Sequence, residues 1–163
     1  LFDFATVLEN VMFPMEFFTD WSKAQRLERA HYCLEKVNVI GSDNKYPNEL
    51  SGGMQKRVGI ARAIALNPEY LFCDEPNSGL DPYTSILIDR LISSLTKEFN
   101  MTTVVNTHDM NSILEIGDKI GFISKGELLW QGDRHTILQP DCQELKDFVC
   151  ANTLARNIIE GRK

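Results

Sequence analysis

A serine and two glycines stand directly ahead of a helix-forming stretch, in the segment LSGGMQ of residues 50–55. Glycine costs a helix interior about 1 kcal/mol relative to alanine, so a pair of them calls for a reason. Amides at a helix N-terminus are unpaired and partly positive, and glycine lets a phosphate approach them without meeting a Cβ atom. Ser51, Gly52 and Gly53 therefore predict a site for a terminal phosphate. An ordinary N-cap serine beside a glycine turn is the competing interpretation.

Two adjacent carboxylates, Asp74 and Glu75, follow the apolar segment YLFC. In doubly wound sheets, ligands bind beyond the carboxyl ends of the strands. An aspartate there can hold Mg²⁺, usually through water, with phosphate oxygens completing the coordination. The next side chain leaves the strand on the other face and can orient or deprotonate a water. The alternative is a charged pair that ends a strand as it meets solvent.

Asp81 and His108 complete the set of polar residues that could do chemistry. Asp81 lies in the turn NSGLDP, where an aspartate before a proline is unremarkable. His108 follows the apolar segment TVVNT, and a neutral imidazole there can hydrogen-bond a phosphate or an attacking water. A lone histidine is more often a structural residue. A functional interpretation of Asp81 and His108 is therefore supported only because they follow the other groups in this order.

The elements that must position these residues predict an α/β fold with a parallel sheet flanked by helices. The first third reads as helical, with Thr6 and Ser22 as N-caps and with Pro14 ending or kinking the first helix. The later segments then alternate between strand and helix, which is typical of a parallel sheet. They are strands at 70–74 and 102–107, both buried on two faces, helices at 52–66, 82–99 and 110–117, and an edge hairpin that turns at Lys125 and Gly126.

We expect three parts along the chain: a helical subdomain at 1–50, an α/β core at 51–139 and a tail at 140–163 that is expected to be helical.

The net charge of −6 argues against a protein that coats nucleic acid. The 4 cysteines lie at no metal-binding spacing, which suits a reducing compartment. No apolar run approaches the roughly 18 residues that span a bilayer. The chain begins at Leu1 in what reads as mid-domain sequence, so we expect a fragment.

The ordered set resembles the ATP-binding subunit of ABC transporters, over about residues 1–139. Residues 50–55 resemble the signature loop of that family, and residues 78–81 resemble its D-loop. The resemblance implies a partial P-loop NTPase fold with an N-terminal helical subdomain. It also implies that ATP is bound by the following residues: Ser51, Gly52, Gly53, Gln55 and Asp81.

The resemblance assigns the remaining polar groups as well. Residues 70–74 resemble the Walker B strand, with Asp74 helping to hold Mg²⁺. Glu75 stands at the position of the catalytic glutamate and His108 at that of the switch histidine. Two features depart from the family pattern: Met54 replaces the usual glutamine of the signature, and no G-x-x-x-x-G-K-[ST] occurs. Because the phosphate-binding loop is missing, we expect this chain alone to bind Mg-ATP poorly and to hydrolyse essentially none. We also expect it to self-associate through its uncovered sheet or to hold a rearranged sheet edge.

For the whole protein, the resemblance implies a head-to-tail pair of ATPase subunits bound to a membrane permease on the cytoplasmic face of the inner membrane. Residues 1–20 are the expected permease contact. The chain is similar to Mla-type ATPases in the segments LFDFATVLENVMFP, LSGGM and ARAIALNPEYLFCDEPNSGLDP. This similarity implies lipid transport and an MCE-type periplasmic lipid-binding partner. The alternatives are ABC-type ATPases of DNA repair, chromosome organisation or the ribosome, which have no permease. A non-catalytic α/β domain is the remaining alternative.

Overall fold

The computed structural model describes residues 1–139 and 141–151. The chain divides into two compact units, Leu1–Asn106 and Thr107–Lys163. The three-part division predicted from the sequence stays a prediction. No helix within the described ranges is long and apolar enough to cross a bilayer.

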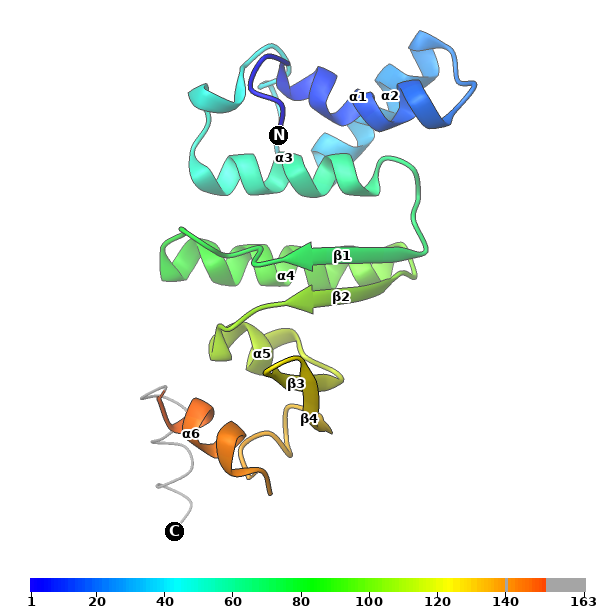
Figure 1. Ribbon diagram of the computed structural model, residues 1–163. Coiled ribbons are helices and arrows are strands. Elements are labelled where there is room, and N and C mark those ends of the chain that lie inside the picture. Colours follow the sequence, from blue (N-terminus) through cyan, green and yellow to red (C-terminus); the bar gives the residue numbers. More distant parts are fainter. Residues whose placement is uncertain (140, 152–163) are drawn as a thin grey trace. The chain divides into compact units, whose positions relative to one another are not determined.

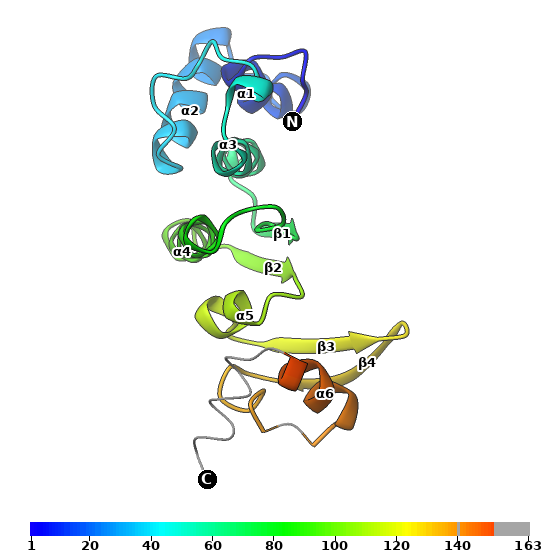
Figure 2. The ribbon, with the colours of Figure 1, turned by 90° about the vertical axis from the view of Figure 1, so that its left-hand side faces the viewer.

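The first unit begins with a helical layer. It contains α1 (Val7–Phe18), α2 (Lys23–Lys36), the short 3-10 helix η1 (Pro47–Glu49) and α3 (Gly52–Ile64). Figures 1 and 2 show α3 lying between the α1–α2 pair and a second layer, which contains two strands and α4 (Pro82–Glu98). The helix that carries the serine and glycines is therefore packed on both sides.

Local capping fixes where the first two helices start. Thr6 accepts a hydrogen bond from the Glu9 amide and Glu9 reaches back to the Thr6 amide, and Ser22 pairs with Gln25 in the same way. Both predicted caps are confirmed. Pro14 does not end α1, which continues to Phe18. The buried face of α1, which packs on α2 and α3, offsets the hydrogen bond that proline removes.

The second layer is a parallel pair of strands, β1 (Tyr70–Asp74) and β2 (Thr102–Asn106), connected through α4. In this register Phe72 is paired with Val104 and Asp74 with Asn106. Leu71 is buried, whereas Phe72 is 74% and Val104 49% exposed. The expectation that both strands are buried on two faces is therefore wrong for this chain, because one face of the sheet is uncovered among the described residues.

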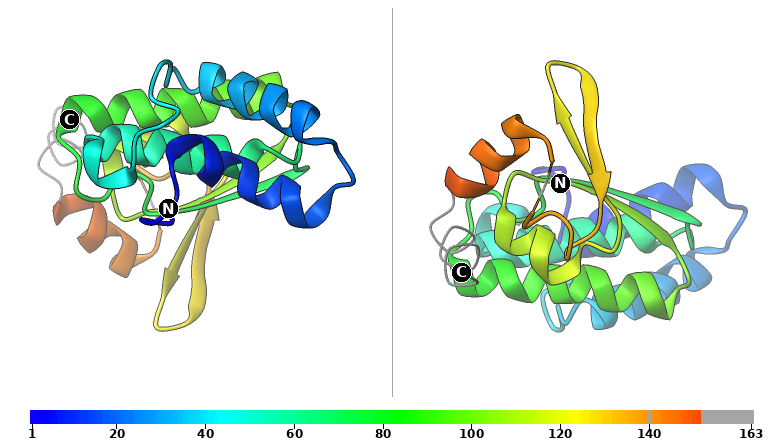
Figure 3. Two further views of the ribbon diagram at one scale, coloured as in Figure 1. Left: turned by 90° about the horizontal axis from the view of Figure 1, so that it is seen from above. Right: turned by 90° about the horizontal axis from the view of Figure 1, so that it is seen from below.

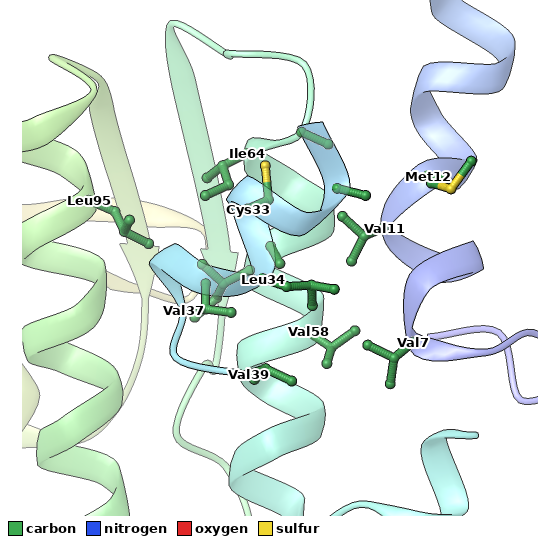
Figure 4. Packing of buried hydrophobic residues seen from close by; sticks show 14 of the residues in the cluster. Val7, Val11, Met12, Cys33, Leu34, Val37, Val39, Val58, Ile64 and Leu95 are labelled. Carbon is green, nitrogen blue, oxygen red and sulfur yellow. The ribbon is translucent and has the colours of Figure 1, made fainter. Parts of the chain in front are cut away.

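One apolar cluster joins the layers of the first unit (Figure 4). Val7 and Val11 of α1, Leu34 of α2 and Val58 of α3 point toward one another, and each has at most 1% of its surface exposed. Burying such a side chain contributes about 1.5–3 kcal/mol. The helical layer thereby fixes α3 firmly enough for its N-terminus to be a defined site.

Asparagines in a left-handed conformation follow three of these helices. Asn38 comes after α2 with φ 56°, Asn67 after α3 with φ 50°, and Asn100 after α4 with φ 51°. Asparagine tolerates this region better than most residues with a side chain. Each helix therefore ends on a local signal.

The second unit contains α5 (Met110–Ile116), the antiparallel strands β3 (Ile120–Ser124) and β4 (Glu127–Gly132), and α6 (Gln143–Ala151). The predicted turn is confirmed, with left-handed Lys125 and Gly126 between the strands, which form the ribbon drawn in Figure 3. The expected place of this hairpin at the edge of the main sheet is wrong, because within the described ranges it is a separate two-stranded sheet.

Helix α6 packs on that hairpin through an aromatic pair. The ring centroids of Phe122 and Phe148 are 5.6 Å apart, and both side chains border a small apolar cluster. The helix predicted in the tail is present at α6. The rest of that prediction, at residues 140 and 152–163, lies outside the described residues.

Candidate functional site

The N-terminus of α3 is capped by Ser51. Its hydroxyl oxygen accepts a hydrogen bond from the Met54 amide at 3.3 Å, and Gly52 is the first helical residue. Ser51 and Gly52 are exposed. The capping role does not compete with anion binding, because the hydroxyl proton is still available as a donor.

Both glycines of this helix start pack against the segment that follows the carboxylates. A Cβ atom added at Gly52 would lie 3.3 Å from Leu80 Cδ2, and one added at Gly53 would lie 2.7 Å from Thr84 Cγ2. Neither glycine has positive φ. No pattern in the sequence signals this contact, because the two segments are far apart along the chain.

Gln55 supports the loop in front of the helix. Its side-chain amide donates to the carbonyl oxygens of Pro47 at 2.9 Å and Leu50 at 3.3 Å. On α3, Lys56 Nζ donates to the carbonyl oxygen of Glu75 at 3.2 Å. Gln55 is thus engaged with the chain's own backbone, and Lys56 connects α3 to the carboxylate segment.

The carboxylate of Asp74 is oriented by the neighbouring strand. Asn106 Nδ2 donates to Asp74 Oδ1 at 2.7 Å, as the strand register allows. Asn106 was not predicted as a site residue, although a polar side chain at the carboxyl end of the next strand was a usable signal. Its amide leaves Asp74 with lone pairs for a further ligand.

Glu75 has an uncommon backbone conformation. Its φ is 45°, in the left-handed region that residues with a side chain seldom adopt. The Glu75 amide donates to the Asn106 carbonyl at 2.9 Å, and the Glu75 carbonyl accepts from Lys56. Strained residues of this kind cost about 1–3 kcal/mol and cluster at functional sites. The conformation turns the chain sharply, directly after Asp74.

Asp81 is the N-cap of α4. Its Oδ1 accepts from the amides of Tyr83 at 3.1 Å and Thr84 at 3.0 Å, and its Oδ2 accepts from the Thr84 hydroxyl. The Thr84 side-chain bond is the largest cause that lowers the pKa of Asp81, followed by the bond from the Thr84 backbone. Asp81 is therefore anionic at neutral pH and holds the turn that precedes α4.

A buried polar pair secures the segment between Glu75 and Asp81. Asn77 Nδ2 donates to Asp89 Oδ1 at 2.8 Å, and Asp89 is 2% exposed. Neither residue was predicted to matter. Such a buried pair has to be satisfied, so it fixes the loop against α4.

His108 belongs to the second unit. It lies two residues after the end of β2 and immediately before Asp109, which caps α5 by accepting from the Asn111 amide at 2.9 Å. The other predicted site residues belong to the first unit. The first unit therefore brings together the glycine helix start, the carboxylates and Asp81, without His108.

The donor set at the carboxylates fits a hydrated cation better than a protein cage. Within the described ranges no three acidic, histidine or cysteine side chains gather into a metal-binding group. Mg²⁺ keeps several waters and is held in proteins by one or two carboxylates together with substrate phosphates. Asp74, oriented by Asn106, is suited to that mode of binding.

Comparison with known proteins shows what the chain is similar to. A family model described as "ABC transporter" matches residues 1–78. "Methionine import ATP-binding protein MetN 2" of Bacillus licheniformis is 40% identical over 145 residues, which are 88% of this chain and 42% of that protein. "Methionine import ATP-binding protein MetN" of Carboxydothermus hydrogenoformans is 42% identical over 132 residues, 81% of this chain and 39% of that protein. The chain thus spans about two fifths of the length of these relatives.

Solved structures agree with this result. The dimeric structure of MJ0796, described as a bacterial ABC transporter cassette, has a TM-score of 0.72 and 37% identity, and the match covers 82% of this chain and 59% of that one. A second structure of MJ0796, in a post-hydrolysis state with ADP and Pi, matches equally well. The expected α/β fold of an ABC ATPase is confirmed. This chain is therefore similar to ABC transporter ATP-binding proteins, over residues 1–78 in the family model and over most of its length in these relatives and structures.

Proposed function

We propose that the whole protein is the ATP-hydrolysing subunit of an ABC transporter. One observation carries the proposal: three groups pack together in the first unit. They are the N-terminus of α3 with its two glycines, the carboxylates that follow β1, and the turn that contains Asp81. The match of residues 1–78 to the ABC transporter family model and the likeness to a cassette with ADP and Pi support it. Phosphoryl transfer needs mainly positioning and charge neutralisation, which such scattered groups can provide.

In this proposal, Ser51, Gly52 and Gly53 donate hydrogen bonds to the terminal phosphate of an ATP bound chiefly by a second subunit. Exposed donors at a helix N-terminus are suited to that role. The dimeric structure of the similar cassette supports a paired arrangement. Gln55 acts by holding the loop that presents these donors.

The two carboxylates have separate roles, one toward the metal ion and one toward the attacking water. Asp74 would hold Mg²⁺, which neutralises charge on the phosphate oxygens when it is bound. Glu75 orients the water and accepts its proton, and the sharp turn at Glu75 supports this role by separating its direction from that of Asp74. His108 hydrogen-bonds the γ-phosphate, and Asp81 couples the two sites of the pair.

Replacement of Glu75 by Gln in the whole protein tests this role. We expect steady-state ATP hydrolysis to fall by about 10²–10⁴-fold, because general base catalysis is lost. Bound ATP should remain on the enzyme. Glu69→Gln, an exposed residue immediately before β1, is the matched control and should leave turnover unchanged. Undiminished hydrolysis by Glu75→Gln would overturn the proposal.

We infer that a membrane permease is the partner and that the ATPase binds it from the cytoplasmic side of the membrane. The relatives named above are methionine importers, which supports a small amino acid as cargo and import as the direction. Those relatives do not support the expected lipid cargo or an MCE-type partner. The description of the matching family likewise favours transport over a role in DNA repair or translation.

Uptake by proteoliposomes distinguishes the two cargoes. The whole protein, reconstituted with its proposed permease partner, should accumulate labelled L-methionine when ATP is supplied on the ATPase side. Labelled phospholipid moved between membranes in the same system, without methionine uptake, would contradict amino-acid import. The Glu75→Gln protein serves as the energy-uncoupled control in both assays.

A further inference from the structure

Gly53 occupies a position where a side chain would collide with Thr84. A Cβ atom placed on Gly53 would lie 2.7 Å from Thr84 Cγ2, whereas non-bonded carbon atoms settle at about 3.5–4.0 Å. The backbone of Gly53 does not demand glycine, since its φ is not positive. Its absent side chain is therefore explained by the Thr84 methyl group, independently of any ligand.

Thr84 cannot simply turn its methyl group aside. Its hydroxyl donates to Asp81 Oδ2 and its amide donates to Asp81 Oδ1 at 3.0 Å. Threonine has few χ1 rotamers because it is branched at Cβ, so rotation would break the side-chain bond to Asp81. Asp81 thereby sets the direction in which the methyl group points.

The same segment contacts the preceding glycine. Leu80 Cδ2 lies 3.3 Å from the position of a Cβ atom on Gly52, and Leu80 packs on the main apolar cluster. The first turn of α3 therefore meets the start of α4 and the residue before its N-cap at two points. These points are Leu80 against Gly52, and Thr84 against Gly53.

We propose that Thr84 is a positioning residue that holds the Gly52 and Gly53 amides and the Asp81 carboxylate in one fixed arrangement. The proposal rests on the proposed function, in which both elements meet the same bound nucleotide. A displacement of about 1 Å in a positioning group can lower a rate by about 10²-fold. A methyl group packed into the space of a missing side chain prevents such a displacement without touching the nucleotide.

A size-exchange experiment in the whole protein tests this role. Gly53→Ala should lower kcat for ATP hydrolysis by about 10- to 100-fold, because the new methyl group forces the two turns apart. Thr84→Ser keeps the hydroxyl bond to Asp81 but removes the methyl group that packs against Gly53, so it should lower kcat by about 3- to 10-fold. The double variant Gly53→Ala, Thr84→Ser should recover most of the activity that Gly53→Ala loses.

Failure of that rescue overturns the positioning role. A double variant as inactive as Gly53→Ala would mean that the ligand, and not Thr84, requires glycine at residue 53. The proposed function would then stand, as long as the wild type hydrolyses ATP and Glu75→Gln does not. A wild type without hydrolysis would overturn the proposed function, and the positioning role with it.

Gly59 provides a matched control on the same helix. A Cβ atom there meets nothing within 4 Å, so Gly59→Ala should raise Tm by about 2–4 °C through helix propensity alone. Gly53→Ala should not raise Tm in this way, because its methyl group clashes with Thr84. The double variant, which lacks the clash, should show the rise in Tm. An equal rise in Tm for Gly53→Ala and Gly59→Ala would show that no clash exists and would overturn the inference.

Discussion

Cys33 illustrates how burial alone sets the chemistry of a side chain. It is completely buried on α2, and burial raises the pKa of its thiol to about 11, against a small opposing effect of Arg29. A thiol in this state is neutral and unreactive at neutral pH. Glu75 differs from Cys33 in that its reactive group stands at a turn with a costly, left-handed backbone conformation.

We expect the stability of the chain to fall in alkali partly because of Cys33. The pKa of the thiol is about 11 when folded and 9.0 when unfolded, so its contribution is complete below pH 9 and is lost as the pH rises toward 11. About 2–3 kcal/mol of unfolding free energy is at stake over that window. Urea unfolding at pH 8 and pH 10.5 measures it.

The matched variants separate Cys33 from other groups that titrate in alkali. Cys33→Ala should have the lower stability at pH 8 but a smaller loss on going to pH 10.5. Cys142→Ala, which removes a half-buried thiol of the second unit, should keep the wild-type pH dependence. Equal losses in the Cys33→Ala and wild-type chains would contradict the assignment.

At the scale of elements, the join between α2 and the end of α3 depends on Arg29. Its guanidinium donates to the carbonyl oxygens of Ile64 at 2.8 Å and Ala65 at 3.0 Å, at the C-terminal end of α3. The same group lies 5.0 Å from the centre of the Tyr32 ring. One side chain thus caps α3 and attaches α2 to it.

We expect Arg29→Lys to lower the free energy of unfolding by about 1.5–3 kcal/mol. Lysine keeps the charge but cannot place two donors on neighbouring carbonyls in the planar geometry of arginine. Arg26→Lys is the control on the same helix, because its ion pair with Glu16 spans 3.9 Å and such surface pairs contribute little. Denaturant unfolding of both variants measures the difference. Equal free energies of unfolding for Arg29→Lys and Arg26→Lys would disprove the role of Arg29.

Local signals explain which elements were predicted correctly. The caps at Thr6 and Ser22 and the turn at Lys125 and Gly126 each depend on a few neighbouring residues, so the sequence is enough to find them. Pro14 does not end α1, the first of its two predicted effects, because that effect depends on tertiary packing of α1. Propensity is only a weak prior where packing competes.

The candidate site was predictable only in part, for a related reason. Ser51, Asp74 and Glu75 stand at element ends that periodicity reveals. The place of Asn106 at a strand end was a usable signal for its bond to Asp74. The contact of Gly53 with Thr84 joins segments distant along the chain, and no local pattern predicts it. The exposure of the β1–β2 sheet likewise depends on what covers it.

At the scale of the whole molecule, one face of the β1–β2 sheet presents a continuous apolar surface among the described residues. Tyr70, Phe72 and Val104 are all exposed there, and Phe72 and Val104 are register partners. Exposed apolar patches of this kind mark surfaces that become covered by another segment or another molecule. The expectation that this chain self-associates therefore stays a prediction, now located on named residues.

We expect the wild-type chain to form dimers or larger species at micromolar concentration and Phe72→Lys to shift it toward monomer. The lysine places a charge in the apolar face that association would bury. Ile86→Lys, at an exposed position on α4, is the control and should leave the association unchanged. Size-exclusion chromatography with light scattering measures this, and a monodisperse wild-type monomer would refute it.

The three left-handed asparagines have a consequence for how this unit tolerates change. Each of these three helices is followed, two or three residues after its last residue, by its left-handed asparagine. The point where the helix ends is therefore specified locally. Insertions into the connections downstream should therefore leave helical phase intact. The connecting segments can therefore change in length while the buried faces of these helices stay in place.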